Sequence, residues 1–247
     1  PSVTYLRRGP EDLGLYPDGE QPLDDTAEAP RGFRRDIRDI SWTLKEARRT
    51  RAFWMILVFV SVDRFALGAI NLHLVINFQD QGLSAFQAAS ILTIFATTSA
   101  ITGVPWGFVF EKMHIRYNAM LISFLLFLSM GLLLIADNYF LGILFGFAFG
   151  FAVGGSSIVE NLLWADFFGR RHLGEIRGFT APFRFLSPTG PTITGFIHDQ
   201  TGSYRIAYSI FAGIFFLMFL AMSFATPPVH KADQAKIEES ETPAADA

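Results

Sequence analysis

Six long apolar segments constrain the fold of this chain more than any other feature of its sequence. Each has about the 20 residues that an α-helix needs to cross a hydrocarbon core of about 30 Å. In lipid a segment must satisfy its backbone hydrogen bonds internally, which favours a helix. The segments are 53–78, 86–110, 117–136, 139–164, 178–197 and 207–225. The sequence therefore predicts an all-α integral membrane protein, a six-transmembrane-helix bundle.

The composition of the chain agrees with a lipid environment. Of its 247 residues, 51% are hydrophobic and only 17% are charged, against roughly 25% charged in a soluble domain. The net charge of -3 says little about partners, because in membrane proteins the placement of Lys and Arg matters more than their sum. Nothing suggests nucleic acid binding or a cofactor. The chain contains no cysteine, which excludes disulfides, thiolate metal sites and a cysteine nucleophile.

Lys and Arg residues are distributed unevenly between the loops. They are concentrated before the first segment and in the second and fourth loops, whereas the first and third loops have none and the fifth has only Arg205. The positive-inside rule places the basic loops in the cytoplasm, and an even number of spans places both termini there. We therefore expect a multi-pass protein of the cell membrane, inner or plasma.

Three regions follow from this pattern. Residues 1–50 are polar and are predicted to form a cytoplasmic loop, 51–226 the six-helix transmembrane domain, and 227–247 a disordered cytoplasmic tail. Near the end of the first region, Thr43 and Glu46 have the spacing of a capping box, which predicts a short helix at the membrane surface. A plain polar coil is the alternative there.

The loop after the second segment carries a motif in the run GFVFEKMHIR at 107–116. It resembles the cytoplasmic loop motif of the major facilitator superfamily, in which a glycine precedes an acid-base pair and a final basic residue. In that family the motif acts as a charged latch of the inward-closed state. The match is partial, since Glu111, Lys112 and His114 stand where Asp, Arg and Gly are usual. The resemblance implies that Gly107, Glu111, Lys112 and Arg116 belong to a cytoplasmic gate.

The fourth loop, 164–178, resembles the loop between helices ten and eleven of bacterial members of this superfamily. These include branches grouped with monocarboxylate and oxalate-formate carriers. The resemblance adds four residues to the cytoplasmic gate: Asp166, Gly169, Arg170 and Arg171.

Three further runs extend the resemblance over nearly the whole chain. They are 13–19 for the central loop, 52–54 for the entry to helix seven and 199–204 for the link to helix twelve. The chain is thus similar to the C-terminal half of such a fold, helices 7–12, and the N-terminal six-helix half is the expected partner. Because the first residue is Pro1 and no signal peptide opens the chain, we expect a fragment or a processed chain.

Charged residues inside the apolar segments are candidate sites, because a charge at mid-bilayer costs about 2.5 to 3.5 kcal/mol on insertion scales and needs a partner or a cavity. Asp63 and Arg64 lie near the middle of the first segment. They point about 100° apart on a helix, so one can meet a cavity while the other pairs with a neighbouring helix. A structural pair and a substrate or proton site remain equal alternatives.

Four more polar residues are candidates for substrate or proton coupling. Glu160 and Arg184 lie at similar distances from the cytoplasmic end of the fourth and fifth segments, which predicts a structural or gating ion pair, with substrate contact by Arg184 as the alternative. Asn71 and His73 lie near the outer end of the first segment. A lone histidine there is more often a hydrogen-bonded interface residue than a proton switch.

Glycine and proline mark two of the segments. Gly142, Gly146, Gly150 and Gly154 recur every four residues in the fourth segment, which predicts close helix packing. The fifth segment contains Pro182, Pro188 and Pro191, which interrupt its backbone hydrogen bonds. In transporters such interruptions mark gates or binding sites, and a packed kink is the equal alternative.

The leading function is therefore half of a secondary transporter that moves a small solute by alternating access. A proton-coupled organic anion is the favoured cargo, because Arg64 or Arg184 would supply fixed positive charge and Asp63 or Glu160 a proton site. A transporter-like sensor without flux is the alternative. An enzyme is disfavoured, because the histidines at 73, 114, 172, 198 and 230 have no metal-ligand spacing.

Overall fold

The computed structural model describes residues 42–225, except for the side chains of Arg184 and Leu186. This part of the chain consists of helices joined by short connections, and it contains no strand. The predicted tail and most of the predicted central loop lie outside the described residues.

Four helices are long and apolar enough to cross a membrane. They are α2 (Arg51–Asp80), α5 (Ile115–Ile135), α6 (Tyr139–Phe168) and α9 (Arg205–Phe224). A fifth crossing is formed by α3 (Ala85–Ile101) and α4 (Gly103–Lys112) if the pair counts as one span bent by 45°. The all-α membrane bundle predicted from the sequence is confirmed.

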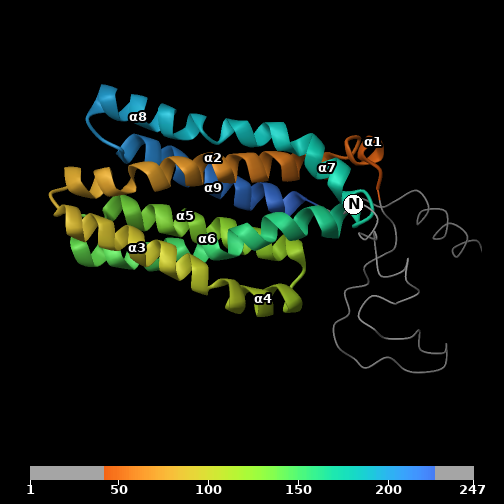
Figure 1. The fold of residues 1–247 in the computed structure, drawn as a ribbon, viewed down its shortest axis with the longest axis horizontal. Coiled ribbons are helices and arrows are strands. Elements are labelled where there is room, and N and C mark those ends of the chain that lie inside the picture. Colours follow the sequence, from red (N-terminus) through yellow and green to blue (C-terminus); the bar gives the residue numbers. More distant parts are fainter. Residues whose placement is uncertain (1–41, 226–247) are drawn as a thin grey trace, which may run out of the picture. The chain divides into compact units, whose positions relative to one another are not determined.

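The segment predicted at 178–197 is interrupted, as its prolines indicate. It is divided into α7 (Leu173–Thr180), the 3-10 helix η4 (Ala181–Leu186) and α8 (Thr189–Thr201). Pro182 and Pro188 lie within or next to the break, and proline has no N–H to continue the helical hydrogen bonds. In Figure 1 the broken segment runs alongside α2.

The short helix predicted before the first span is present as α1 (Leu44–Ala47). Its capping box is complete, because the Thr43 hydroxyl accepts from the Glu46 N–H while the Glu46 carboxylate accepts from the Thr43 N–H. These two bonds satisfy donors that the first turn of a helix leaves open.

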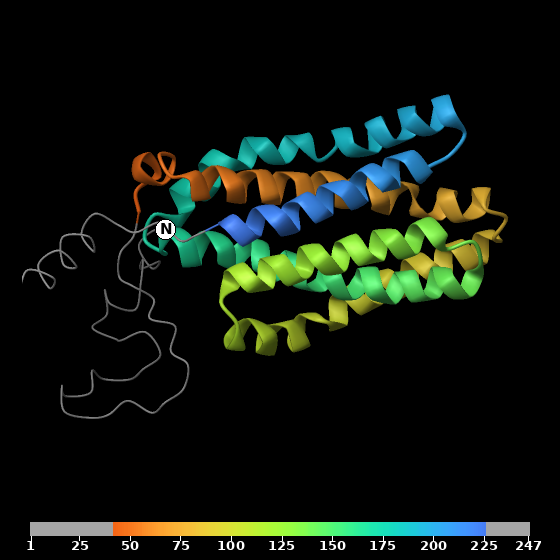
Figure 2. The ribbon, with the colours of Figure 1, turned by 180° about the vertical axis from the view of Figure 1, so that it is seen from behind.

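Close packing of α6 against α3 follows from the glycine spacing of α6. A Cβ atom at Gly150 would lie 2.6 Å from the Phe95 carbonyl oxygen, and one at Gly154 would lie 2.1 Å from Thr102 Oγ1. Only residues without a side chain allow the two backbones to come this close. The predicted tight packing is therefore confirmed. Figure 2 shows the other side of the bundle, where α9 lies between α2 and α5.

Candidate functional site

A cluster of polar side chains joins α2 to α6 inside the bundle. Arg64 Nε donates to Glu160 Oε2 over 2.7 Å, and Arg64 Nη2 contacts the same oxygen. The Glu160 side chain is 5% exposed, whereas that of Arg64 is 39% exposed. The pair therefore joins a buried carboxylate to a guanidinium that is also accessible from outside this bundle.

Asp63 lies beside this ion pair and contacts the same helix. Its Oδ2 accepts a hydrogen bond of 2.8 Å from Ser156 Oγ, and the residue is 2% exposed. Its other oxygen, Oδ1, is buried and has no hydrogen-bond partner within the part of the chain that the structure describes. Ser156 and Glu160 are four residues apart on α6, so they lie on one face of that helix. Below, Asp63, Arg64, Ser156 and Glu160 are called the polar cluster.

The break between η4 and α8 lies against α2 at the polar cluster. Ser187 Oγ donates to the Arg64 carbonyl oxygen over 3.0 Å. A Cβ atom at Gly190 would lie 2.4 Å from the Phe65 carbonyl oxygen. The break in this segment thus lies directly against the α2 backbone at Arg64, whose side chain is partly exposed.

The predicted pair of Glu160 with Arg184 is not tested, because the Arg184 side chain lies outside what the structure describes. What the structure shows is that Glu160 is bound by Arg64. Asn71 lies seven residues beyond Arg64 on α2, on the same helix face, and is exposed. Arg64 and Asn71 therefore form a polar strip along one face of α2.

His73 is a hydrogen-bonded interface residue. Its Nε2 lies 2.9 Å from the Pro191 carbonyl oxygen and its Nδ1 lies 3.1 Å from the Tyr204 hydroxyl. A carbonyl only accepts, so Nε2 must carry the proton; in a neutral ring Nδ1 then accepts from Tyr204. His73 thereby links α2 to α8 and to the start of α9.

A second histidine completes this connection at the C-terminal end of α2. His198 Nε2 lies 3.1 Å from Asp80 Oδ2, and its ring stacks on Tyr204 with centroids 4.2 Å apart. Burial, and to a lesser extent the charges of Asp80 and Asp199, raises the pKa of Tyr204. Tyr204 therefore stays a neutral phenol that donates to His73. We call Asp80, His198, Tyr204 and His73 the histidine clasp.

A family comparison now gives this arrangement its context. A profile described as the Major Facilitator Superfamily matches residues 53–246, which is most of the chain. The chain belongs to the Major Facilitator Superfamily. A search among curated proteins gives no match. Membership in this family of transporters, together with the apolar helices, makes the chain a multi-pass membrane protein of transporter type.

The run that resembles the superfamily motif begins within α4 and ends in the first turn of α5. Glu111 and Lys112 are exposed, and a Cβ atom at Gly107 would meet nothing within 4 Å. Arg116 is the exception, because its Nη2 donates to the Ser223 carbonyl oxygen at the end of α9. Within this motif, Glu111 and Lys112 thus lie at the surface and Gly107 has open space beside it. Arg116 instead joins α5 to α9.

The second superfamily loop follows α6 directly. Gly169 ends that helix with a φ of 76°, a left-handed conformation that glycine adopts without strain. Arg170 is exposed, and Asp166 and Arg171 are exposed residues that have partners. The gate role of these residues stays a prediction.

Several residues that complete the site were missed in the sequence. Ser156 binds Asp63, Ser187 binds the α2 backbone, and Tyr204 binds His73. Ser156 had a usable signal, since it precedes Glu160 by one helical turn in a largely apolar segment. Ser187 and Tyr204 had none, because their partners are 123 and 131 residues away. Within the described residues no group of three acidic, histidine or cysteine side chains is placed to hold a metal ion.

Proposed function

We propose that this chain is the C-terminal half of a secondary active transporter that moves a small organic anion, together with a proton, by alternating access. The observation that supports this most directly is the Arg64 side chain, which is bound by Glu160 and yet 39% exposed near the middle of α2. A charge at that depth needs a partner or a water-filled cavity, and Arg64 has a partner in Glu160 while part of its guanidinium stays exposed.

The broken segment supports the same location for a binding site. Transporters of several folds place substrate sites near the bilayer midplane, next to interrupted helices. Here the junction of η4 and α8 lies against Arg64 and Phe65. A small carboxylate bound to the exposed side of the Arg64 guanidinium would lie between α2 and α8.

Asp63 is the proposed proton site. Its Oδ1 is buried and has no donor in the described structure, so a proton there would displace no existing hydrogen bond, while Oδ2 keeps its bond to Ser156. Glu160 is the alternative proton site. In this scheme the loops after α4 and α6 face the cytoplasm, and a second six-helix half supplies the opposite wall of the cavity.

The test is uptake of labelled carboxylates into proteoliposomes by the transporter that contains this chain. Arg64→Gln should abolish carboxylate uptake, whereas Arg205→Gln, an exposed arginine at the outer start of α9, should leave it intact. Uptake that is unchanged in Arg64→Gln would contradict the anion site. Saturable carboxylate binding without flux in the unmodified protein would instead favour the transporter-like sensor.

A further inference from the structure

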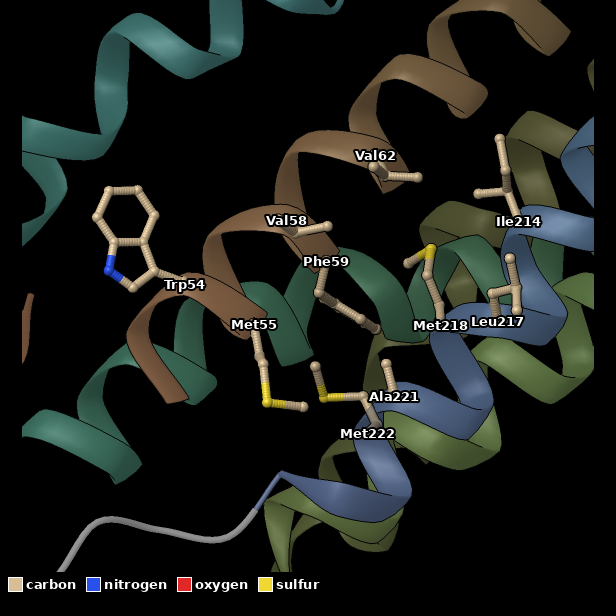
Figure 3. Close-up of a pocket in the computed structure, with 10 residues that line it drawn as sticks. All are labelled: Trp54, Met55, Val58, Phe59, Val62, Ile214, Leu217, Met218, Ala221 and Met222. Atoms are coloured by element: carbon tan, nitrogen blue, oxygen red, sulfur yellow. The ribbon is translucent and has the colours of Figure 1, made fainter. Parts of the chain in front are cut away.

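An apolar groove between α2 and α9 is separate from the polar cluster. It has a volume of about 450 Å³, and its walls present hardly any polar surface. Figure 3 shows the lining side chains on the two helices, with Met55, Met218 and Met222 at the gap between them and Trp54 on the other side of α2. Pockets for small polar molecules carry a few placed polar groups that fix the ligand's orientation, so the lining of this groove fits a hydrocarbon chain.

The side chains of the groove explain its shape. Phe59 and Met222 are almost completely buried and form its floor, while Val58 and Leu217 are 58% and 63% exposed at its edges. Ala221 faces the groove from α9 and is too small to fill it. Met55, Met218 and Met222 also line it, and methionine is flexible enough to follow an irregular acyl chain.

Basic residues precede one end of the groove. Arg51, Met55, Val58 and Val62 are spaced by four, three and four residues, so they lie along one face of α2, with the exposed Arg51 one helical turn before Met55. Arg49 is exposed just before this helix. Trp54 is 44% exposed, and its indole N–H donates to the Arg48 carbonyl oxygen over 3.0 Å. Tryptophan in this position is typical of the membrane-water interface.

We propose that the groove between α2 and α9 binds one anionic phospholipid. An acyl chain lies among the methionines, and the phosphate of the head group is bound by Arg51. The charge complementarity selects an anionic lipid over a zwitterionic one, because basic residues next to the membrane attract anionic head groups. With the proposed orientation, this lipid belongs to the cytoplasmic leaflet.

The position of Trp54 allows a direct measurement on the full 247-residue chain. Of the four tryptophans, Trp106 and Trp164 are buried, and the difference between the unmodified chain and Trp54→Phe isolates the Trp54 fluorescence. The chain is reconstituted in vesicles of fixed phosphatidylglycerol and phosphatidylcholine content. Brominated acyl chains quench tryptophan fluorescence. They are carried by the phosphatidylglycerol in one set of vesicles and by the phosphatidylcholine in the other.

Bromine on phosphatidylglycerol should quench Trp54 at concentrations about fivefold lower than bromine on phosphatidylcholine, the ratio that about 1 kcal/mol from one basic residue produces. Arg51→Gln should remove this preference, and Arg205→Gln, at the opposite end of α9, should retain it. Ala221→Phe should remove the saturable part of the quenching by filling the groove, whereas Ile210→Phe, exposed on α9 outside it, should not.

Quenching that depends only on the fraction of brominated lipid, whatever its head group, would overturn the proposal. So would an equal effect of Arg51→Gln and Arg205→Gln. The unmodified chain and Trp54→Phe decide the first point without any variant that fills the groove, so the result holds even where Ala221→Phe folds poorly. Because no transport is measured, failure here leaves the proposed transport function unaffected, and failure of transport leaves the lipid site unaffected.

Discussion

Arg64 and Glu160 form an ion pair although they are 96 positions apart in the sequence. Each side chain supplies the opposite charge that the other needs inside the bundle. The carboxylate is buried, and removing a charged partner from a buried pair leaves a desolvated charge behind. Arg64 is more exposed than Glu160, so the same contact holds the helices together and leaves part of the guanidinium available.

The ion pair predicts non-additive stability effects. In a double-mutant cycle of Arg64→Gln and Glu160→Gln, the double variant should lose less unfolding free energy than the two single variants lose in sum, by about 0.5 to 3 kcal/mol. Denaturant unfolding of the purified protein in mild detergent measures this coupling. Arg205→Gln combined with Glu160→Gln is the control and should be additive, because Arg205 lies at the start of another helix. Additive effects in the Arg64 cycle would show that the contact stabilises nothing.

Asp63 predicts a separate effect on coupling. Asp63→Asn keeps an oxygen to accept from Ser156 but removes the proton site. In proteoliposomes of the whole transporter, uptake driven by a pH gradient should be lost while solute exchange without a gradient persists. Ser156→Ala should keep gradient-driven uptake. If Asp63→Asn retained it, the proton would have to be carried elsewhere, with Glu160 next to be tested.

At the scale of the elements, glycine positions allow neighbouring helices to pack closely, and prolines interrupt one of the helices. The contact of α3 with α6 depends on glycines that a side chain would push apart. The contact of α8 with α2 depends on Gly190, next to the proline-rich break. These positions were visible in the sequence as glycine and proline patterns, but the partner of each helix was not.

The α3–α6 contact predicts opposite outcomes for one kind of substitution. Gly150→Ala places a Cβ atom 2.6 Å from the Phe95 carbonyl oxygen, a backbone atom that cannot move alone. It should destabilise the protein by about 1 to 3 kcal/mol, the usual cost of overpacking. Gly131→Ala on α5 meets nothing within 4 Å and should be neutral or stabilising. Thermal unfolding in detergent compares the two, and equal melting temperatures would contradict the close contact.

At the scale of the whole molecule, the arrangement of charged loops divides the bundle into two ends. Basic residues follow α4 and α6 at one end, while the histidine clasp and the loop after α5 are at the other. The same asymmetry supports the predicted orientation and places basic residues before one end of the phospholipid groove.

Cysteine labelling checks this orientation without a background signal, because the chain contains no cysteine. Gln81→Cys, exposed after α2, should react in intact cells with a maleimide that does not cross membranes. Arg170→Cys, exposed after α6, should react only after the cells are permeabilised. The physical reason is the retention of Lys and Arg on the cytoplasmic side during insertion. The reverse pattern would invert the proposed topology.

The sequence by itself determined the properties that depend on local composition. Apolar length specified α2, α5, α6 and α9 as membrane helices, because lipid leaves the backbone little alternative. The capping box specified α1, and the glycine repeat specified a face for close packing. The charges of the polar cluster were also visible, because charge in an apolar segment is rare.

Only the tertiary structure decided the pairing and continuity of these elements. It joined Arg64 to Glu160 and Asp63 to Ser156, and it set the bounds of the three helical pieces into which the proline-containing segment after α6 is divided. Such outcomes depend on side chains and carbonyl groups that come from distant parts of the chain. A hydrogen bond lost at a proline is restored or left open according to the neighbouring helix, and no local pattern specifies which neighbour that is.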